Sequence, residues 1–118
     1  MKRIAFIDLG SNSVRFVIYE ISKTGSYRLI YQEKESVRLS ENMWGTQELT
    51  NEAMERSLRS LKAFVHMSKA MEVDTIKAVA TAAVRLAKNG DVFIKIVKER
   101  TGLDLECIAG EEEARLGF

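Results

Sequence analysis

Hydrophobic residues in the first third of the chain recur with the spacing of β-strands. An apolar run at residues 4–7 predicts a buried strand, and apolar positions resume at residues 14–21 after a stretch of small polar residues. The two strands are expected to form a hairpin whose turn lies at residues 8–13. A more polar stretch at residues 27–38 predicts a third strand, nearer an edge of the sheet.

From residue 50 the hydrophobic spacing changes to that of a helix. Apolar residues recur every three or four positions across residues 50–71, and Thr50 is suited to cap the amino-terminal end. The pattern therefore predicts one long amphipathic helix. Its central apolar stripe consists of Met54, Leu58, Leu61 and Val65.

The remainder of the chain alternates between short strand and helix patterns. A buried strand is expected at residues 75–80, followed by a brief helical turn at 81–88 and a helix near 91–101. A fifth strand is predicted at residues 103–109, and a further helix begins at residue 110. The element order therefore indicates a mixed α/β domain with five strands.

The connections in this element order predict where a ligand would bind. The first, fourth and fifth strands are expected to lie parallel, because connections through a helix are right-handed crossovers. Ligands of open α/β sheets bind beyond the carboxyl ends of the parallel strands. The chain has small or polar residues at all three of these ends: 8–13, 81–85 and 110–113.

Composition narrows the class of protein. The 118 residues suit one domain, and a net charge of +1 excludes a strongly basic nucleic-acid binder. No apolar run approaches the roughly 20 residues that a bilayer requires, so a cytoplasmic chain is expected. The single cysteine, Cys107, excludes an internal disulfide and a cysteine-based zinc site. It falls in a predicted buried strand, where a small core residue is expected.

Each polar strand end has a structural as well as a chemical interpretation. Residues 10–13 offer consecutive backbone N–H groups and hydroxyls that could bind an anion, but a hairpin turn favours the same residue types. Asp8 could coordinate a metal ion or brace the turn. Thr81 and the amides after it could hold a phosphate, with Arg85 adding charge one turn later. An arginine on a short helix is otherwise usually solvated.

Three consecutive glutamates, Glu111, Glu112 and Glu113, open the last predicted helix. Carboxylates are favoured in a first helical turn whatever their function, because of the helix dipole. Successive helical residues point about 100° apart, so the three side chains cannot share one role.

Three segments together resemble one known family. They are residues 8–15 (DLGSNSVR), 78–89 (AVATAAVRLAKN) and 110–115 (GEEEAR). In this order and spacing they are similar to the exopolyphosphatase and guanosine pentaphosphate phosphohydrolase family, within the superfamily of actin, sugar kinases and heat-shock ATPases. The resemblance covers nearly the whole chain, residues 4–116. It implies a ribonuclease H-like mixed five-stranded sheet with flanking helices.

The resemblance also implies a reaction. Members of the family hydrolyse terminal phosphoanhydride bonds of inorganic polyphosphate or guanosine pentaphosphate and release orthophosphate, with Mg²⁺ (or Mn²⁺) as cofactor. Here Asp8 would hold the metal ion, Arg85 would contact the phosphate chain, and Glu113 matches the general base. The phosphate-binding residues would be Gly10, Ser11, Asn12, Ser13, Thr81, Gly110 and, by a looser match, Arg15.

The family's second phosphate loop and second domain have no counterpart in this sequence. We therefore expect residues 1–118 to be the first half of the N-terminal domain, inactive without the remainder of the enzyme. The expected partners are the phosphate substrate and that remainder, with a homodimer at full length and neither membrane nor nucleic acid. Two alternatives stay open: a kinase or ATPase half of the same superfamily, and a non-catalytic regulator that binds guanosine tetra- or pentaphosphate.

Overall fold

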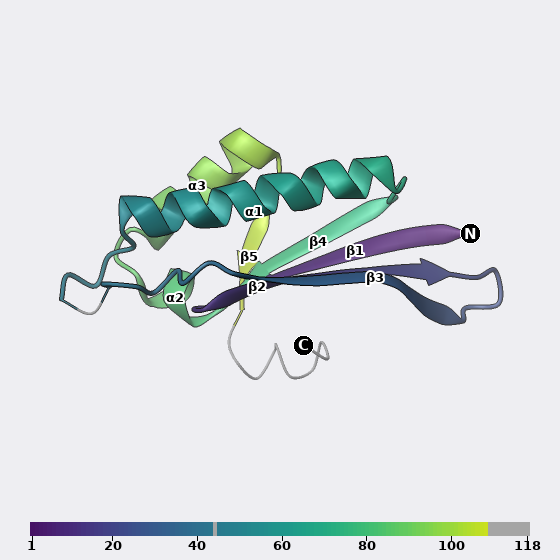
Figure 1. The fold of residues 1–118 in the computed structure, drawn as a ribbon, viewed down its shortest axis with the longest axis horizontal. Coiled ribbons are helices and arrows are strands. Elements are labelled where there is room, and N and C mark those ends of the chain that lie inside the picture. Colours follow the sequence, from purple (N-terminus) through teal and green to yellow (C-terminus); the bar gives the residue numbers. More distant parts are fainter. Residues whose placement is uncertain (44, 109–118) are drawn as a thin grey trace.

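The computed structural model describes residues 1–43 and 45–108, which form one sheet and three helices (Figure 1). The strands are β1 (Lys2–Leu9), β2 (Ser13–Ile21), β3 (Tyr27–Ser36), β4 (Thr75–Ala80) and β5 (Leu105–Cys107). The helices are α1 (Asn51–Ala70), α2 (Ala82–Leu86) and α3 (Gly90–Thr101). The predicted mixed α/β fold with five strands is confirmed.

The sheet has the strand order β3-β2-β1-β4-β5. The pairs β1–β2 and β2–β3 are antiparallel hairpins, whereas β4 lies parallel to both β1 and β5. The predictions that β3 lies at an edge and that β1, β4 and β5 are parallel are therefore confirmed. Helices α1 and α3 lie on the same side of the sheet (Figure 1).

The hydrophobic core lies between α1 and the sheet. Alternate residues of β1 and β2 are buried under the helix, and the ring of Phe16 stacks on that of Phe64 with centroids 4.6 Å apart. Burying a side chain of this kind contributes about 1.5–3 kcal/mol. Thr50 caps α1 as predicted, because its hydroxyl accepts a hydrogen bond from the Ala53 N–H at 3.1 Å.

The structure corrects the ends of three elements. Asp8 belongs to β1 and pairs with Arg15, so the turn of the first hairpin is shorter than predicted. Strand β3 ends at Ser36, because the next residues turn toward the loop after β1. Strand β5 starts and ends inside the predicted range, and the helix predicted from residue 110 lies outside the described residues.

The prediction that Cys107 is a core residue is wrong, because its side chain is exposed. Strand β5 is an edge strand, and of its three residues only Leu105 is buried. An apolar strand pattern does not reveal whether a second strand or a helix covers both sides. Over the described residues, no helix has the length and hydrophobicity needed to cross a membrane.

Candidate phosphate-binding site

The carboxyl ends of β1, β4 and β5 meet at one rim of the sheet. The Thr81 N–H donates to the Leu9 carbonyl at 3.1 Å, and the Ile108 N–H donates to the Ala80 carbonyl at 2.9 Å. The loop after β1 therefore adjoins the start of α2, as expected for parallel strands. The third predicted junction, which includes Gly110 and Glu113, lies outside the described residues.

The loop after β1 is tightly closed around Gly10. The Gly10 N–H donates to the Ser13 carbonyl at 2.9 Å, across the mouth of the hairpin. A Cβ atom added at Gly10 would lie 3.4 Å from the Ser13 carbonyl oxygen and 3.9 Å from Thr81 Oγ1. Both distances are ordinary van der Waals contacts, so the loop and the start of α2 adjoin one another but would leave room for a Cβ atom at this position.

Two carbonyl groups of this loop are directed toward the segment after β3. The carbonyls of Ser11 and Asn12 accept hydrogen bonds from the segment after β3. A trans peptide points its C=O and its N–H in opposite directions, and the described residues contain no cis peptide. The N–H groups of Asn12 and Ser13 therefore point away from that segment, as an anion-binding loop requires. The donors to the two carbonyls are Val37, Arg38 and Ser40, at 3.0, 2.9 and 3.0 Å.

Asp8 lies in the last part of β1, on the face of the sheet opposite the core. In the strand register it is flanked by Arg15 of β2 and Val79 of β4. Asp8 is half-buried and Arg15 is exposed. A carboxylate at this rim fits a Mg²⁺ ion, which usually takes one or two protein carboxylates and completes its shell with water and phosphate oxygens. Within the described ranges no three His, Cys, Asp or Glu side chains form a group that could bind a metal ion unaided.

Arg85 is exposed in the last turn of α2. Its N–H donates to the Thr81 carbonyl at 3.1 Å, so the helical turn holds it one turn beyond the rim. The charge of Arg85 also acts on Cys107 in β5. Partial desolvation of this largely exposed side chain raises the pKa of its thiol, Asp91 raises it further, and Arg85 lowers it. Arg85 therefore lies within electrostatic range of the exposed end of β5.

Asn89 makes a long-range contact that the sequence did not predict. Its side chain hydrogen-bonds the backbone of Leu49, which is 40 residues earlier in the chain. An asparagine before a helix is typical of a cap or a turn, and no sequence pattern marks a distant backbone group as its partner. The position falls inside one of the three resembling segments, which was the one available signal.

Comparison with known proteins agrees with this geometry. The sequence model of the Ppx/GppA phosphatase family matches residues 17–118. A guanosine-5'-triphosphate,3'-diphosphate pyrophosphatase of Pseudoalteromonas atlantica is 41% identical over 111 residues, covering 94% of this chain and 22% of that protein. The chain therefore spans about a fifth of the length of this curated relative.

Solved structures of the family superpose closely on the chain. A Ppx/GppA family member from Aquifex aeolicus matches with a TM-score of 0.92 and 36% identity, over 97% of this chain and 37% of that one. An exopolyphosphatase from Cytophaga hutchinsonii matches with a TM-score of 0.91 and 33% identity, over 98% and 36%.

A more distant likeness concerns the fold alone. Thermus thermophilus RuvC matches with a TM-score of 0.54 and 10% identity, over 96% of this chain and 69% of that one. It supports the ribonuclease H-like description of the sheet. With a family match over most of its length and a matching arrangement of strand ends, the chain belongs to the Ppx/GppA phosphatase family.

Proposed function

We propose that the chain forms one wall of the active site of an enzyme that hydrolyses terminal phosphoanhydride bonds. The substrates would be inorganic polyphosphate or guanosine pentaphosphate, and orthophosphate would be released. The observation that carries the proposal is the shared rim, where residues 10–13 and the Arg85 helix adjoin. The names of the relatives from Pseudoalteromonas and Cytophaga support this substrate class. In this proposal residues 1–118 are the first half of the N-terminal domain.

The residues of the rim suit a phosphate chain. Backbone N–H groups and hydroxyls of residues 10–13 would donate hydrogen bonds to phosphate oxygens, together with Thr81 and with Gly110, which lies outside the described residues. The guanidinium of Arg85 would pair with a phosphate on one side of the loop, and that of Arg15 on the other. Charge-assisted hydrogen bonds of this kind are about twice as strong as neutral ones.

Asp8 would hold the divalent cation, Mg²⁺ or Mn²⁺, because its carboxylate lies next to the loop that would hold the phosphates. When bound, such an ion would supply positive charge that neutralises the charge developing on the phosphate oxygens. The protein groups would then fix the terminal phosphoryl group in line with an attacking water.

Glu113 would act as the general base. Its carboxylate would accept a proton from the water as the water oxygen bonds to the terminal phosphorus. The bridging oxygen–phosphorus bond breaks, and its electron pair leaves with the shortened phosphate chain. A carboxylate near phosphates and shielded from water has a raised pKa, which suits a base that works near neutral pH.

The test joins residues 1–118 to the remaining portion of the Pseudoalteromonas relative and measures orthophosphate release from polyphosphate and guanosine pentaphosphate. We expect turnover by the joined protein and none by residues 1–118 alone, which provide one wall of the site. Glu113→Gln should reduce kcat by roughly 10²–10⁴-fold, as for the loss of a general base, and leave substrate affinity unchanged.

Glu112→Gln is the matched control, since in the helix that the sequence predicts from residue 110 its side chain would point in a different direction. Equal losses in the two variants, or full turnover by Glu113→Gln, would remove Glu113 from the role. Transfer of phosphate to an alcohol instead of water would favour the kinase alternative. Nucleotide binding without any hydrolysis would favour the regulator.

A further inference from the structure

The connection between β3 and α1 contacts both arms of the candidate site. One arm is the loop at residues 10–13, and the other is α2 with Arg85 and the residues that follow it. Where it begins, its N–H groups hold the carbonyls of Ser11 and Asn12, as described above. Where it ends, the Gln47 carbonyl accepts a hydrogen bond from the Lys88 N–H at 2.8 Å. Residues 37–50, of which all but Trp44 are described, therefore link the loop after β1 to the residues after α2.

Asn89 fastens the end of this β3–α1 connection. Its Oδ1 accepts a hydrogen bond from the Leu49 N–H at 2.8 Å, and its Nδ2 donates to the Leu49 carbonyl at 3.0 Å. Asn89 precedes α3, where an asparagine side chain usually caps the helix and contributes about 1 kcal/mol. Here the side chain makes no cap hydrogen bond. Both of its polar groups are directed to Leu49 instead.

The next residue, Gly90, brings α3 against the backbone of α2. A Cβ atom added at Gly90 would lie 2.1 Å from the Val84 carbonyl oxygen, so only a glycine fits. Arg85 directly follows Val84. Because this contact is made by backbone atoms, no flexible side chain can absorb a displacement of residues 88–90 before it reaches α2.

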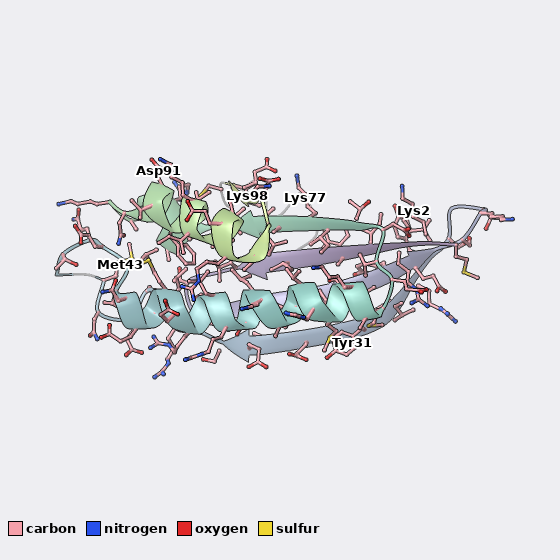
Figure 2. The ribbon with its side chains drawn as sticks, turned by 90° about the horizontal axis from the view of Figure 1, so that it is seen from above. Lys2, Tyr31, Met43, Lys77, Asp91 and Lys98 are labelled. Carbon is pink, nitrogen blue, oxygen red and sulfur yellow. The ribbon has the colours of Figure 1, made fainter. Side chains whose placement is uncertain are left out.

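The β3–α1 connection is packed against the rest of the domain near both of its ends, whereas residues 45–48 are exposed. Four apolar side chains among its described residues are in the core, and Arg56 of α1 donates to the carbonyls of Val37 at 2.9 Å and Arg38 at 3.1 Å. Figure 2 shows Met43 of the connection and Asp91 of α3 at the same end of the molecule. Long connections without regular structure are uncommon in compact domains and often functional. The buried residues are Val37, Leu39, Met43 and Leu49.

We propose that Asn89 is a positioning residue: by holding the β3–α1 connection, it sets the separation between residues 10–13 and Arg85. This inference rests on the proposed function for the ligand, a phosphate chain that both arms would grip together. Its physical basis is the geometric demand of such a site, where a misplacement of about 1 Å can cost about a hundredfold in rate. Asn89 itself would touch no substrate.

The first experiment tests the separation without ligand. Amide resonances of the 118-residue chain are compared between wild type, Asn89→Ala and Asn51→Ala. The control, Asn51, is an exposed asparagine two residues from Leu49. We expect Asn89→Ala to shift the amides of residues 11–13 and 82–86, and Asn51→Ala to leave them in place. Shifts confined to residues 46–50 and 87–92 would overturn the inference.

The second experiment adds tripolyphosphate as the probe and measures its dissociation constant. Asn89→Ala should weaken binding about tenfold, within the usual range for coupled contacts. In an Arg85→Ala background the same change should cost less than about twofold, because the group that Asn89 positions is gone. A residue with a purely structural role would lower the melting temperature and give equal losses in both backgrounds.

The outcomes separate this inference from the proposed function. One outcome would be that Asn89→Ala shifts the amides of residues 11–13 and 82–86 while the wild-type chain binds no tripolyphosphate. That outcome would contradict the proposed function and support the positioning contact. If Asn89→Ala does not fold, Arg56→Ala tests the same connection from its other end. That variant should shift the amides of residues 88–90, and their invariance would overturn the inference.

Discussion

Glu20 illustrates how a single charged residue is accommodated at the end of the sheet opposite the candidate site. Its side chain is 10% exposed, and its oxygens accept hydrogen bonds from Arg3 Nε at 3.2 Å and Arg28 at 2.8 Å. Burial raises the pKa of Glu20, but the two guanidinium groups outweigh it, so the pKa lies below its usual value. Arg3 also donates to the Met71 carbonyl at 2.6 Å, which ties β1 to the end of α1.

Glu20→Gln should destabilise the fold in a pH-dependent way. At neutral pH the carboxylate is ionised in both states, and its ion pairs stabilise the folded one. As the pH falls below 4.5, the ordinary pKa of a glutamate carboxyl, the unfolded state takes up a proton first. The advantage of wild type over the variant should therefore shrink as the pH falls from about 5 to about 3.

Urea unfolding at constant ionic strength measures this difference. Glu48→Gln, a change at an exposed glutamate, is the control and should lack the pH dependence. An advantage of wild type that grows toward low pH would show that the ion pairs do not stabilise the folded state.

At the scale of the elements, α2 and α3 pack so closely at Gly90 that this position has no room for a side chain. Gly90→Ala should therefore lower the free energy of unfolding by about 1–3 kcal/mol, the usual cost of forcing an extra carbon into a packed site. Gly45→Ala is the control, since an added Cβ there has no atom within 4 Å. Equal urea midpoints for the two variants would mean that the helices separate at little cost.

The features that could be predicted from the sequence are those that depend on residues close together in the chain. The stripe of α1 and its cap at Thr50 are local features, and both are confirmed. The meeting of residues 8–13 with residues 81–85 was also predictable, because it follows from parallel strands. The β3–α1 connection was not, because it has no hydrophobic period and its hydrogen bonds join backbone groups far apart in the chain. The bidentate contact of Asn89 belongs to the same class.

Across the whole molecule, stability should be greatest at the centre of the sheet. Strand β1 is paired on both sides and buries Ala5, Ile7 and Leu9, whereas β5 is a three-residue edge strand. Segments with many buried contacts open only in global unfolding. In hydrogen–deuterium exchange we expect the amides of β1 to be the slowest of the sheet and those of β5 the fastest. Equal protection in both strands would contradict this gradient.

The direction of the peptide groups at residues 11–13 has a consequence for what may approach the rim. With the oxygens of Ser11 and Asn12 engaged by the β3–α1 connection, the backbone presents hydrogens rather than oxygens on its other side. A bare cation would meet positive partial charge there and would be repelled. A cation would therefore bind near these N–H groups only where a negative charge offsets the repulsion. That charge would come from the carboxylate of Asp8 or from the bound anion itself. The backbone of residues 11–13 alone would therefore favour anions over cations.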